Sequence, residues 1–463
     1  MAARELLKRT LWTSSSPLSF LRRSFSSKRV VDMADKDGEL RVFVVAGEVS
    51  GDSISSRLMS SLKSLSPFPI RFSGVGGTLM HKEGLRSLFP MEDIAVMGIW
   101  ELVPHLNKFR VKINETVEAA ILFRPHVVVT VDSKGFSFRF LKKLRARSTE
   151  LGTQHPVHVH YVAPSFWAWK GGERRLGGLS EFVDHLLCIL PFEEEVCRSN
   201  GLAATFVGHP MVEDALSFNL GNTSLDRWKV EGNGKGFRDE YGLSSGAQVI
   251  TLLPGSRLQE VTRMLPVFLN AVHLLKDSFP GLTAVIPVAP NHHVEKYVDT
   301  AIQTSPVSAI LIAGASINQK YDAFSASTAA LCTSGTAVME LQLARLPCLV
   351  AYRAHFLTEW LIQYRTKLQY ISLPNILMNS SVIPEVLFHS CTPENLAVLA
   401  RKLIMDADLR DLQIGSAKKV FELLSPPQGS SGIIYPPHLD SSTGKISPST
   451  IAASTILYSV KHQ

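Results

Sequence analysis

The sequence predicts an α/β protein with two doubly wound halves that face each other across a central cleft. Three observations indicate this fold: a globular composition, two series of apolar runs alternating with amphipathic stretches, and a polar segment between the series. The chain has 463 residues, of which 45% are hydrophobic and 19% are charged. This length suits two or three domains, and this composition is that of a protein with a sizeable core.

The basic charge of the chain is concentrated at its N-terminus. Residues 1–30 hold seven basic residues and one acidic residue, so they account for nearly all of the net charge of +7. The nearly neutral remainder gives no indication of a nucleic-acid-binding face. The same region is rich in Ser and Leu, which is typical of an organellar transit peptide. We expect residues 1–35 to be a disordered presequence, mitochondrial rather than plastid because arginines recur along it. A cytosolic tail is the alternative.

Neither a metal site nor a membrane span is expected from the residue pattern. No apolar stretch reaches the length that spans a bilayer, so we expect any membrane contact to be peripheral. The cysteines form no CxxC pair and have no metal-ligand spacing, which predicts free thiols in a reducing compartment. No cofactor is expected. They are Cys188, Cys197, Cys332, Cys348 and Cys391.

The first half is expected over residues 40–215. Its apolar runs alternate with long helix-like stretches, which is the pattern of a parallel sheet covered on both faces. Ligands of such sheets bind beyond the carboxyl ends of the strands, so we expect functional residues at that edge. The expected strands are 41–48, 126–132, 158–164 and 185–190.

The second half is expected over residues 240–391, after a polar, glycine-containing linker at 222–238. Residues 392–463 are expected to form C-terminal helices, of which Pro393–Met405 is the clearest, and a Pro/Ser/Gly-rich loop. The expected strands of the second half are 248–255, 282–290, 308–314, 329–334 and 347–353.

Two glycine-containing turns in the second half predict a site for a nucleoside diphosphate. Each turn follows an apolar strand and precedes a helix, so its amide N–H groups are expected to attract phosphate. Arg257 suits a bidentate contact with a pyrophosphate, and Glu340 suits the ribose hydroxyls. Ordinary helix caps are the alternative interpretation of both turns. The residues expected at the nucleotide are Gly255, Ser256, Arg257, Thr333, Ser334, Gly335, Thr336 and Glu340.

The first half carries acidic residues at the equivalent positions. The turn "VAGEVSGD" contains Glu48, Ser50 and Asp52, and acidic groups there favour the hydroxyls of a sugar over a phosphate. Asp132 ends another strand and is expected to project at the same edge. A partly desolvated carboxylate has a raised pKa and suits a general base acting on a hydroxyl. A cap of the following helix is the alternative for Asp132.

A third group of candidates combines aromatic and basic residues. The stretch "APSFWAWKGGERR" places Trp167 and Trp169 beside Lys170. Amphipathic aromatics beside cations suit a membrane interface or an acidic lipid head group. A half-buried loop that packs two indoles is the alternative. His209, in "FVGHPMVED", is either a neutral histidine at the domain junction or a contact to substrate.

Eight ordered motifs within residues 40–400 resemble those of lipid-A-disaccharide synthases. The motifs are "VAGEVSGD", "MGIWELVPHL", "HYVAPSFWAWK", "LPFEEE", "FVGHP", "LLPGSR", "TSGTAVMELQLARLPCLVAYR" and "LPNIL". The resemblance implies an inverting glycosyltransferase of the GT-B type, with two Rossmann-like halves and no required metal. In this family, a UDP-linked 2,3-diacylglucosamine donates its sugar to the 6-hydroxyl of 2,3-diacylglucosamine 1-phosphate. The products are a β(1→6) disaccharide 1-phosphate and UDP.

The resemblance also implies residue roles. It makes Asp132 the base on the acceptor hydroxyl and Arg257 the group that neutralises the departing UDP. It assigns 333–336 and Glu340 to the nucleotide and places Asn375 near the diphosphate. Residues 133–140, "SKGFSFRF", depart from the Pro-Asp pair common in bacterial members.

The resemblance bears on the assembly of the protein, and two alternative functions stay open. Bacterial members dimerise through swapped C-terminal segments, so a homodimer is compatible with the resemblance. A UDP-sugar 2-epimerase or another GT-B glycosyltransferase is the first alternative function. A non-catalytic, lipid-binding relative is the second.

Overall fold

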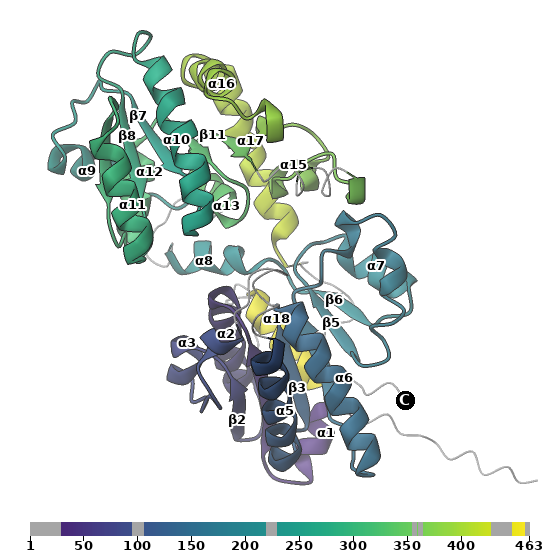
Figure 1. The fold of residues 1–463 in the computed structure, drawn as a ribbon. Helices are drawn as coiled ribbons and strands as arrows, with labels where there is room; N and C mark the ends of the chain where they lie inside the picture. The colour runs from purple at the N-terminus through teal and green to yellow at the C-terminus, as the bar shows by residue number, and fades with distance from the viewer. Residues whose placement is uncertain are drawn as a thin grey trace, which may run out of the picture.

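The computed structural model describes residues 29–94, 106–218, 229–353, 359, 364–426 and 447–458. It contains two six-stranded sheets, one in each half of the chain, with helices packed on their faces (Figure 1). All strand pairs within both sheets are parallel. This arrangement confirms the predicted α/β class with two doubly wound halves.

The first sheet has the strand order β2-β1-β3-β4-β5-β6. The strands are β1 (Leu40–Ala46), β2 (Ile70–Val75), β3 (Val127–Val131), β4 (Val157–Tyr161), β5 (His185–Cys188) and β6 (Ala204–Phe206). The helices of this half are α2 (Val49–Leu65), α3 (Thr78–Lys82), η1 (Met91–Asp93), α5 (Leu106–Phe123), α6 (Lys134–Glu150), η3 (Phe166–Ala168), η4 (Glu173–Arg175) and α7 (Glu193–Ser199). The sequence predicts the four central strands. It does not predict the edge strand β6, which pairs with β5.

The second sheet has the order β12-β11-β10-β7-β8-β9. Its strands are β7 (Val249–Leu253), β8 (Thr283–Pro287), β9 (Ser308–Ile312), β10 (Ala329–Cys332), β11 (Cys348–Tyr352) and β12 (Glu385–Leu387). Its helices are α10 (Leu258–Leu275), α11 (His292–Gln303), α12 (Ile317–Ala326), α13 (Thr336–Leu343), α15 (Leu373–Met378), η5 (Phe388–Ser390), α16 (Pro393–Met405) and α17 (Ala407–Leu424). All five predicted strands are present, and the edge strand β12 is an addition.

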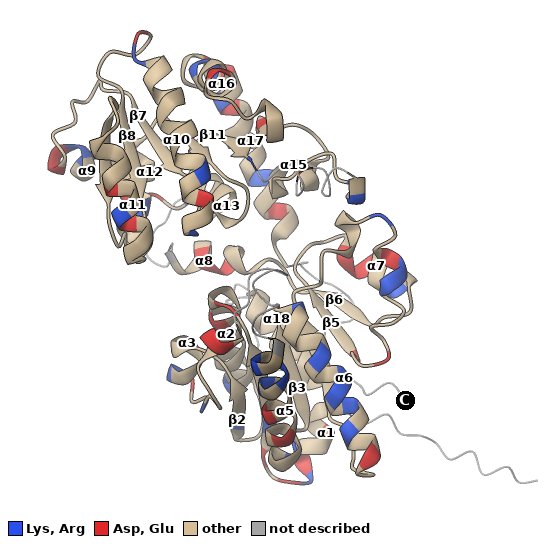
Figure 2. Cartoon of the chain, in the orientation of Figure 1, with Lys and Arg blue, Asp and Glu red and all other residues tan. Residues whose placement is uncertain are grey.

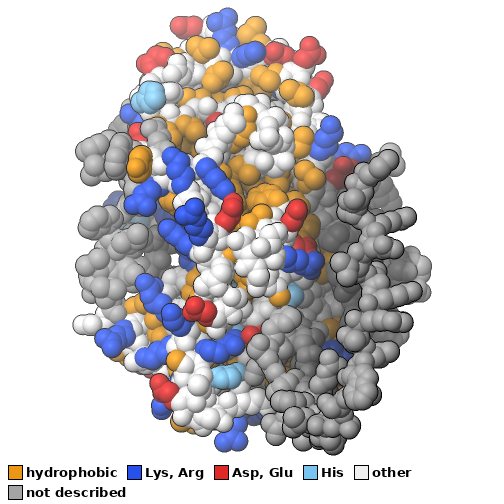
Figure 3. Space-filling view, turned by 90° about the vertical axis from the view of Figure 1, so that its right-hand side faces the viewer, with side chains coloured by type: hydrophobic (Ala, Val, Ile, Leu, Met, Phe, Trp, Pro, Cys, Tyr) orange, Lys and Arg blue, Asp and Glu red, His pale blue; other side chains and the backbone are white. Residues whose placement is uncertain are grey.

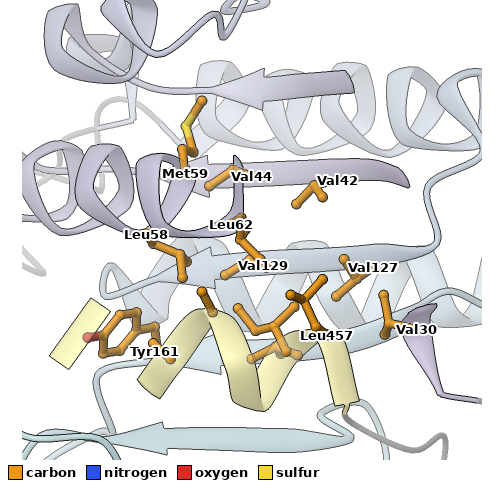
Figure 4. Close-up of a cluster of buried hydrophobic side chains, with 14 of the residues drawn as sticks. Val30, Val42, Val44, Leu58, Met59, Leu62, Val127, Val129, Tyr161 and Leu457 are labelled. Atoms are coloured by element: carbon orange, nitrogen blue, oxygen red, sulfur yellow. The ribbon is translucent and has the colours of Figure 1, made fainter. Parts of the chain in front are cut away.

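The central strands are mostly apolar because helices cover both faces of each sheet. Every residue of β3 and of β7 is buried, as expected for central strands of a parallel sheet. In the first half, Val42, Val44 and Val129 from the sheet meet Leu62 of α2 and Leu457 of the last helix (Figure 4). This cluster joins the two ends of the chain in one core.

The last helix, α18 (Pro448–Tyr458), belongs to the first half although it is the last element in the chain. It packs against α2 and α1 (Val30–Asp35), and Ile451, Ile456 and Leu457 are fully buried there (Figure 1). Most of the expected Pro/Ser/Gly-rich loop, residues 427–446, lies outside the described residues.

Two boundaries differ from those expected. Residues 30–35 are assigned by the sequence to a disordered presequence, but they form α1 because Val30 and Ala34 bury against the core. Residues 222–238 are expected to be a linker, yet α9 (Gly234–Glu240) occupies its end and packs on α12. The side chain of Asn233 caps α9, and Phe237 is buried. Residues 219–228 and 1–28 lie outside the described structure.

The two halves share a hydrophobic cluster at their junction. Leu190 of the first half and Met211 of α8 (Pro210–Phe218) belong to the same cluster as Leu253 and Val338 of the second half. α17 runs from the second half toward this junction (Figure 1), and the His209 N–H donates to the Leu424 carbonyl at its end, at 2.8 Å. The junction therefore contains packed side chains as well as chain crossings.

Candidate active site

Three candidate residues from different strand ends lie close enough to interact at the junction. Glu48 follows β1, Asp132 follows β3 and Arg257 follows the loop after β7. Burial raises the pKa of Glu48, the charge of Asp132 raises it further, and the charge of Arg257 opposes both. The carboxyl edge of each sheet therefore contributes charged groups to one region, as the sequence predicts for ligand sites of such sheets.

Asp132 sits in a left-handed turn between β3 and α6. Its φ is 50° and that of Ser133 is 43°, a conformation that costs free energy in residues other than glycine. The turn is held by the Asp132 N–H, which donates to the Tyr161 carbonyl at 2.9 Å, and by the Ser137 hydroxyl, which donates to the Asp132 carbonyl at 2.8 Å. The N-cap of α6 is Ser133 rather than Asp132. The backbone therefore fixes the direction of the Asp132 carboxylate.

The half-buried position of Asp132 gives its carboxyl an elevated pKa. Burial is the largest cause, while the Ser133 N–H and the charge of Lys134 oppose it. The turn after β1 packs closely against the turn at Asp132 and Ser133. This close packing requires glycine at position 47, because a Cβ there would lie 2.6 Å from the Ser133 hydroxyl. A carboxylate with a raised pKa at a domain junction has the property that a general base needs.

The "VAGEVSGD" turn divides into residues that face the junction and one that does not. Glu48 is half-buried at the N-cap of α2, and Ser50 is exposed in the first turn of that helix. Asp52 is buried, and its carboxylate accepts hydrogen bonds from the N–H groups of Gly77, Leu79 and Met80, each at 3.0 Å. Asp52 therefore holds the start of α3 instead of facing a sugar hydroxyl as the sequence suggests.

The turn between β7 and α10 carries Gly255, Ser256 and Arg257. The φ of Gly255 is +123°, and a Cβ there would lie 2.7 Å from the Glu260 side chain, so the turn requires glycine. Arg257 is the N-cap residue of α10, and half of its side chain is exposed. Its guanidinium lies 3.4 Å from the Glu260 carboxylate, so it remains available for a stronger anionic partner.

The second turn, residues 333–336, connects β10 to α13. Thr333 is buried, and its N–H donates to the Leu253 carbonyl at 3.1 Å, which ties the two turns together at the sheet edge. Gly335 has a φ of +109° and is the N-cap of α13, while Thr336 begins the helix and is exposed. The first N–H groups of a helix such as α13 suit an anion.

The Ser334 hydroxyl points to another segment of its own half. It donates to the Ile371 carbonyl at 3.0 Å, so this hydroxyl already has a partner within the protein. Ser334 therefore supports a ligand site through its position in the turn. Glu340, one turn further along α13, is half-buried and paired with Lys320 of α12 at 2.6 Å. The sequence does not indicate that Lys320 pairs with Glu340, because the two residues lie on separate helices, α12 and α13.

Asn375 supports the fold of the second half from within. It is fully buried, its amide donates to the Ile383 carbonyl at 2.7 Å and to Glu385 at 2.8 Å, and its oxygen accepts from the Ile383 N–H. These three bonds occupy the side chain. The side chain of Asn375 therefore fixes α15 to the neighbouring chain, and the position near a diphosphate that the resemblance implies stays a prediction.

The loop with Trp167, Trp169 and Lys170 contacts the second half directly. The Lys170 N–H donates to the Arg365 carbonyl at 2.9 Å, and the Lys367 N–H donates to the Ala168 carbonyl at 3.1 Å. Trp169 and Thr366 form an antiparallel bridge. The Lys170 ammonium donates to the Tyr364 carbonyl at 2.7 Å and lies 5.5 Å from its ring. This loop therefore joins the halves, a role that its sequence does not indicate.

Trp167 faces the interior. Its indole N–H donates to the buried carboxyl of Glu193 at 3.0 Å, and its ring packs edge-on against Phe192. Glu193 also accepts from the N–H groups of Ile189 and Leu190, at 3.3 and 3.1 Å, while burial raises its pKa to about 7. Of the two interpretations of the loop, the half-buried packing of indoles describes Trp167.

His209 is a half-buried histidine at the junction. Its Nδ1 accepts a hydrogen bond from the Met211 N–H at 3.2 Å, and burial lowers its pKa to about 4. It is therefore neutral at physiological pH, and a contact between His209 and substrate stays a prediction.

In the described ranges, no group of three or more His, Cys, Asp or Glu side chains is placed to hold a metal ion. No helix in the same ranges combines the length and the apolar character that crossing a bilayer requires. All five cysteines are buried free thiols. The motif "MGIWELVPHL" lies almost entirely outside the described structure.

Sequence comparison finds close relatives over nearly the whole chain. A protein family described as "Lipid-A-disaccharide synthetase" matches residues 42–430. An Arabidopsis thaliana protein named "Probable lipid-A-disaccharide synthase, mitochondrial" is 59% identical over 447 residues, which are 95% of this chain and 96% of that protein. A "Lipid-A-disaccharide synthase" of Rhodospirillum centenum is 40% identical over 381 residues, 82% of this chain and 89% of that protein.

Structure comparison finds the same fold in distant proteins. A UDP-GlcNAc 2-epimerase from Neisseria meningitidis, solved with UDP-GlcNAc, aligns with a TM-score of 0.55 and covers 83% of this chain and 98% of that one. The two sequences are 13% identical, so this likeness concerns the fold alone. It agrees with the two-domain GT-B plan.

Proposed function

The chain belongs to the lipid-A-disaccharide synthetase family and is a glycosyltransferase, and we propose that Asp132 and Arg257 carry its chemistry. As the family resemblance implies, the enzyme transfers 2,3-diacylglucosamine from UDP to the 6-hydroxyl of 2,3-diacylglucosamine 1-phosphate. The products are a β(1→6) disaccharide 1-phosphate and UDP.

In the proposed reaction, Asp132 takes the proton of the acceptor hydroxyl as that oxygen attacks the anomeric carbon. The bond from this carbon to the UDP oxygen breaks on the opposite face of the sugar, which inverts the configuration. A positioned general base contributes typically 10²- to 10⁴-fold to such a step. The left-handed turn at 132–133 and the raised pKa of Asp132 support this role.

The departing UDP carries negative charge, and the second half offers groups that stabilise it. Arg257 projects from the N-cap of α10 with half of its side chain exposed. The N-terminus of α13, after Gly335, adds backbone N–H groups and the positive end of a helix dipole. Together these groups stabilise the leaving-group charge. Glu340, held by Lys320, is the proposed acceptor for the ribose hydroxyls.

The observation that carries the proposal is the placement of Asp132 after β3 and of Arg257 after β7, at the carboxyl edges of the two sheets, where the charges of both shift the pKa of Glu48. It joins the proposed base of one half to the proposed leaving-group contact of the other. The test is to incubate the protein with UDP-2,3-diacylglucosamine and 2,3-diacylglucosamine 1-phosphate and to identify the products by mass spectrometry. A disaccharide 1-phosphate formed in step with UDP is expected. Binding of both lipids without UDP release would point to a non-catalytic relative.

We further propose that the protein works at a membrane surface, because both substrates carry acyl chains. Lys170, Arg174 and Arg175 are exposed on the acceptor half, and Lys and Arg residues recur along α6 (Figure 2). Lysine and arginine side chains gather on this side of the molecule (Figure 3). Each such residue near an anionic bilayer contributes about 1 kcal/mol. Flotation with vesicles containing anionic lipid, lost at high salt or with zwitterionic vesicles alone, is the expected result.

Mitochondrial import is the last part of the proposal. The basic, Ser-rich residues 1–28 and the mitochondrial name of the Arabidopsis relative support it. Fusion of residues 1–35 to a fluorescent protein is expected to direct it to mitochondria. Delivery to plastids or retention in the cytosol would contradict this.

A further inference from the structure

Glu385, the first residue of the edge strand β12, makes an unusual number of hydrogen bonds to one neighbouring segment. Its carboxylate accepts from the Ile371 N–H at 2.9 Å, from the Ser372 N–H at 3.0 Å and from the Ser372 hydroxyl at 2.6 Å. The Asn375 amide is a fourth donor, at 2.8 Å. Ser372 is the N-cap of α15. One side chain therefore fixes the entry into this helix.

The segment that Glu385 holds is in direct contact with the nucleotide turn. The carbonyl of Ile371 accepts the Ser334 hydroxyl at 3.0 Å, and Ser334 immediately precedes Gly335, the N-cap of α13. From the Glu385 carboxylate to Ser334 the path consists of one hydrogen bond, one residue and a second hydrogen bond. Glu385 itself is placed by pairing with Val350 of β11. It therefore connects the sheet edge to the turn.

A hydrogen bond to an ionic group contributes more than one between neutral groups, so this path is held more firmly than a turn supported by neutral contacts alone. The turn needs such support because Gly335 is a glycine with a left-handed φ and open space around it. If the turn were flexible, ordering its amide groups on binding would lower the net free energy of binding.

We propose that Glu385 is a positioning residue for the nucleotide: it fixes residues 371–375, and through the Ile371 carbonyl it fixes the N–H groups that bind the diphosphate. Glu385 does not contact the ligand. This inference rests on the proposed function, because it concerns the same UDP site.

The test is the affinity of the full-length protein for UDP, measured by calorimetry without lipid. Glu385→Gln keeps the size of the side chain but replaces one acceptor oxygen with an NH₂ group facing N–H donors. We expect UDP affinity to fall roughly 2- to 30-fold, the range found when a coupling network is disturbed. The matched control, Glu422→Gln, makes the same change at an exposed position on α17 and is expected to bind UDP like the wild type.

A double-mutant cycle separates positioning from a general effect on the fold. Ser334→Ala removes the donor to Ile371, and if Glu385 acts through this bond, the two losses of UDP affinity are not additive. Strict additivity would overturn the proposed path. Ser372→Ala, which deletes one donor and leaves the carboxylate, is expected to give a smaller loss. It serves as the test if Glu385→Gln does not fold, and unchanged UDP affinity in it would then overturn the inference.

The outcomes distinguish this inference from the proposed function. A folded Glu385→Gln variant that binds UDP as tightly as the wild type would overturn the positioning role alone. A wild-type protein that does not bind UDP would overturn the proposed site, and the positioning role with it.

Discussion

The charge of Asp132 raises the pKa of Glu48, although the two carboxylates follow different strands of the first sheet. Arg257, from the other half of the chain, lowers the pKa of Glu48 and so partly offsets the repulsion. The charges of Asp132 and Arg257 thus act on Glu48 in opposite directions, and the first predictions concern Asp132 and Arg257.

Asp132→Asn is expected to lower turnover by roughly 10²- to 10⁴-fold, because the amide cannot take the proton of the acceptor hydroxyl. UDP affinity and the melting temperature are expected to stay near wild-type values, since Asp132 interacts with the fold mainly through its backbone. Steady-state rates, calorimetry and thermal unfolding measure the three properties. Wild-type turnover in this variant would remove Asp132 from the mechanism.

The pH profile of kcat/KM is expected to fall on the acid side at a pH above about 3.9, the ordinary pKa of an aspartate. Burial raises the pKa of Asp132, so the carboxyl keeps its proton to a higher pH than an exposed aspartate would. Only the ionised form acts as a base, and activity is therefore lost as the pH decreases through the raised value. A profile that stays flat down to about pH 4 would contradict this expectation.

Arg257→Ala is expected to weaken UDP binding by about 1.5–3 kcal/mol, the usual value of a hydrogen bond to a charged group. Arg257→Lys keeps the charge but loses the planar fork, so we expect an intermediate loss. Arg263, exposed on the same helix, provides the matched control as Arg263→Ala. Equal UDP affinity and equal rates in the wild type and Arg257→Ala would exclude the proposed contact.

Glu193 is expected to make the stability of the protein depend on pH. Burial raises its pKa from 4.5 to about 7, so the folded state binds this proton more tightly than the unfolded state. Stability from this group is then complete below pH 4.5 and is lost as the pH rises through about 7. Glu193→Gln cannot ionise, and its free energy of unfolding is expected to decline less over this range.

The control for Glu193 is Glu195→Gln, an exposed position on the same helix. It is expected to keep the wild-type pH dependence when denaturant unfolding is measured at several pH values. If the free energy of unfolding depended on pH equally in the wild type and in Glu193→Gln, another group would be the cause of that dependence.

The sequence predicts nine of the twelve described strands, and the eight central strands are all among them, because burial on both faces leaves a continuous apolar run such as "VVVTV" of β3. The edge strands β6 and β12 lack this signal: each has three residues, and they are strands only because a neighbour pairs with them. The left-handed glycines were predictable for a related reason. Gly255 and Gly335 each lie in the turn between a strand and the following helix. Few other residues adopt the positive φ that these turns require.

Partners that are distant in the chain account for most of what the sequence does not predict at the site. Asp52 lies in a motif that suits sugar binding, but it caps a helix that starts at Thr78. Lys320 and Glu385 acquire their roles from contacts with Glu340 and with residues 371–375. A single sequence shows which side chains are polar, whereas the packed chain decides which of their atoms remain available.

The place of α18 has a consequence for how the chain acquires its structure. Ile451, Ile456 and Leu457 cover one face of the first sheet, so a growing polypeptide exposes that apolar face until α18 has been synthesised. The proposed import from the N-terminus would impose the same delay a second time. Until the final helix arrives, this surface is a natural target for chaperones.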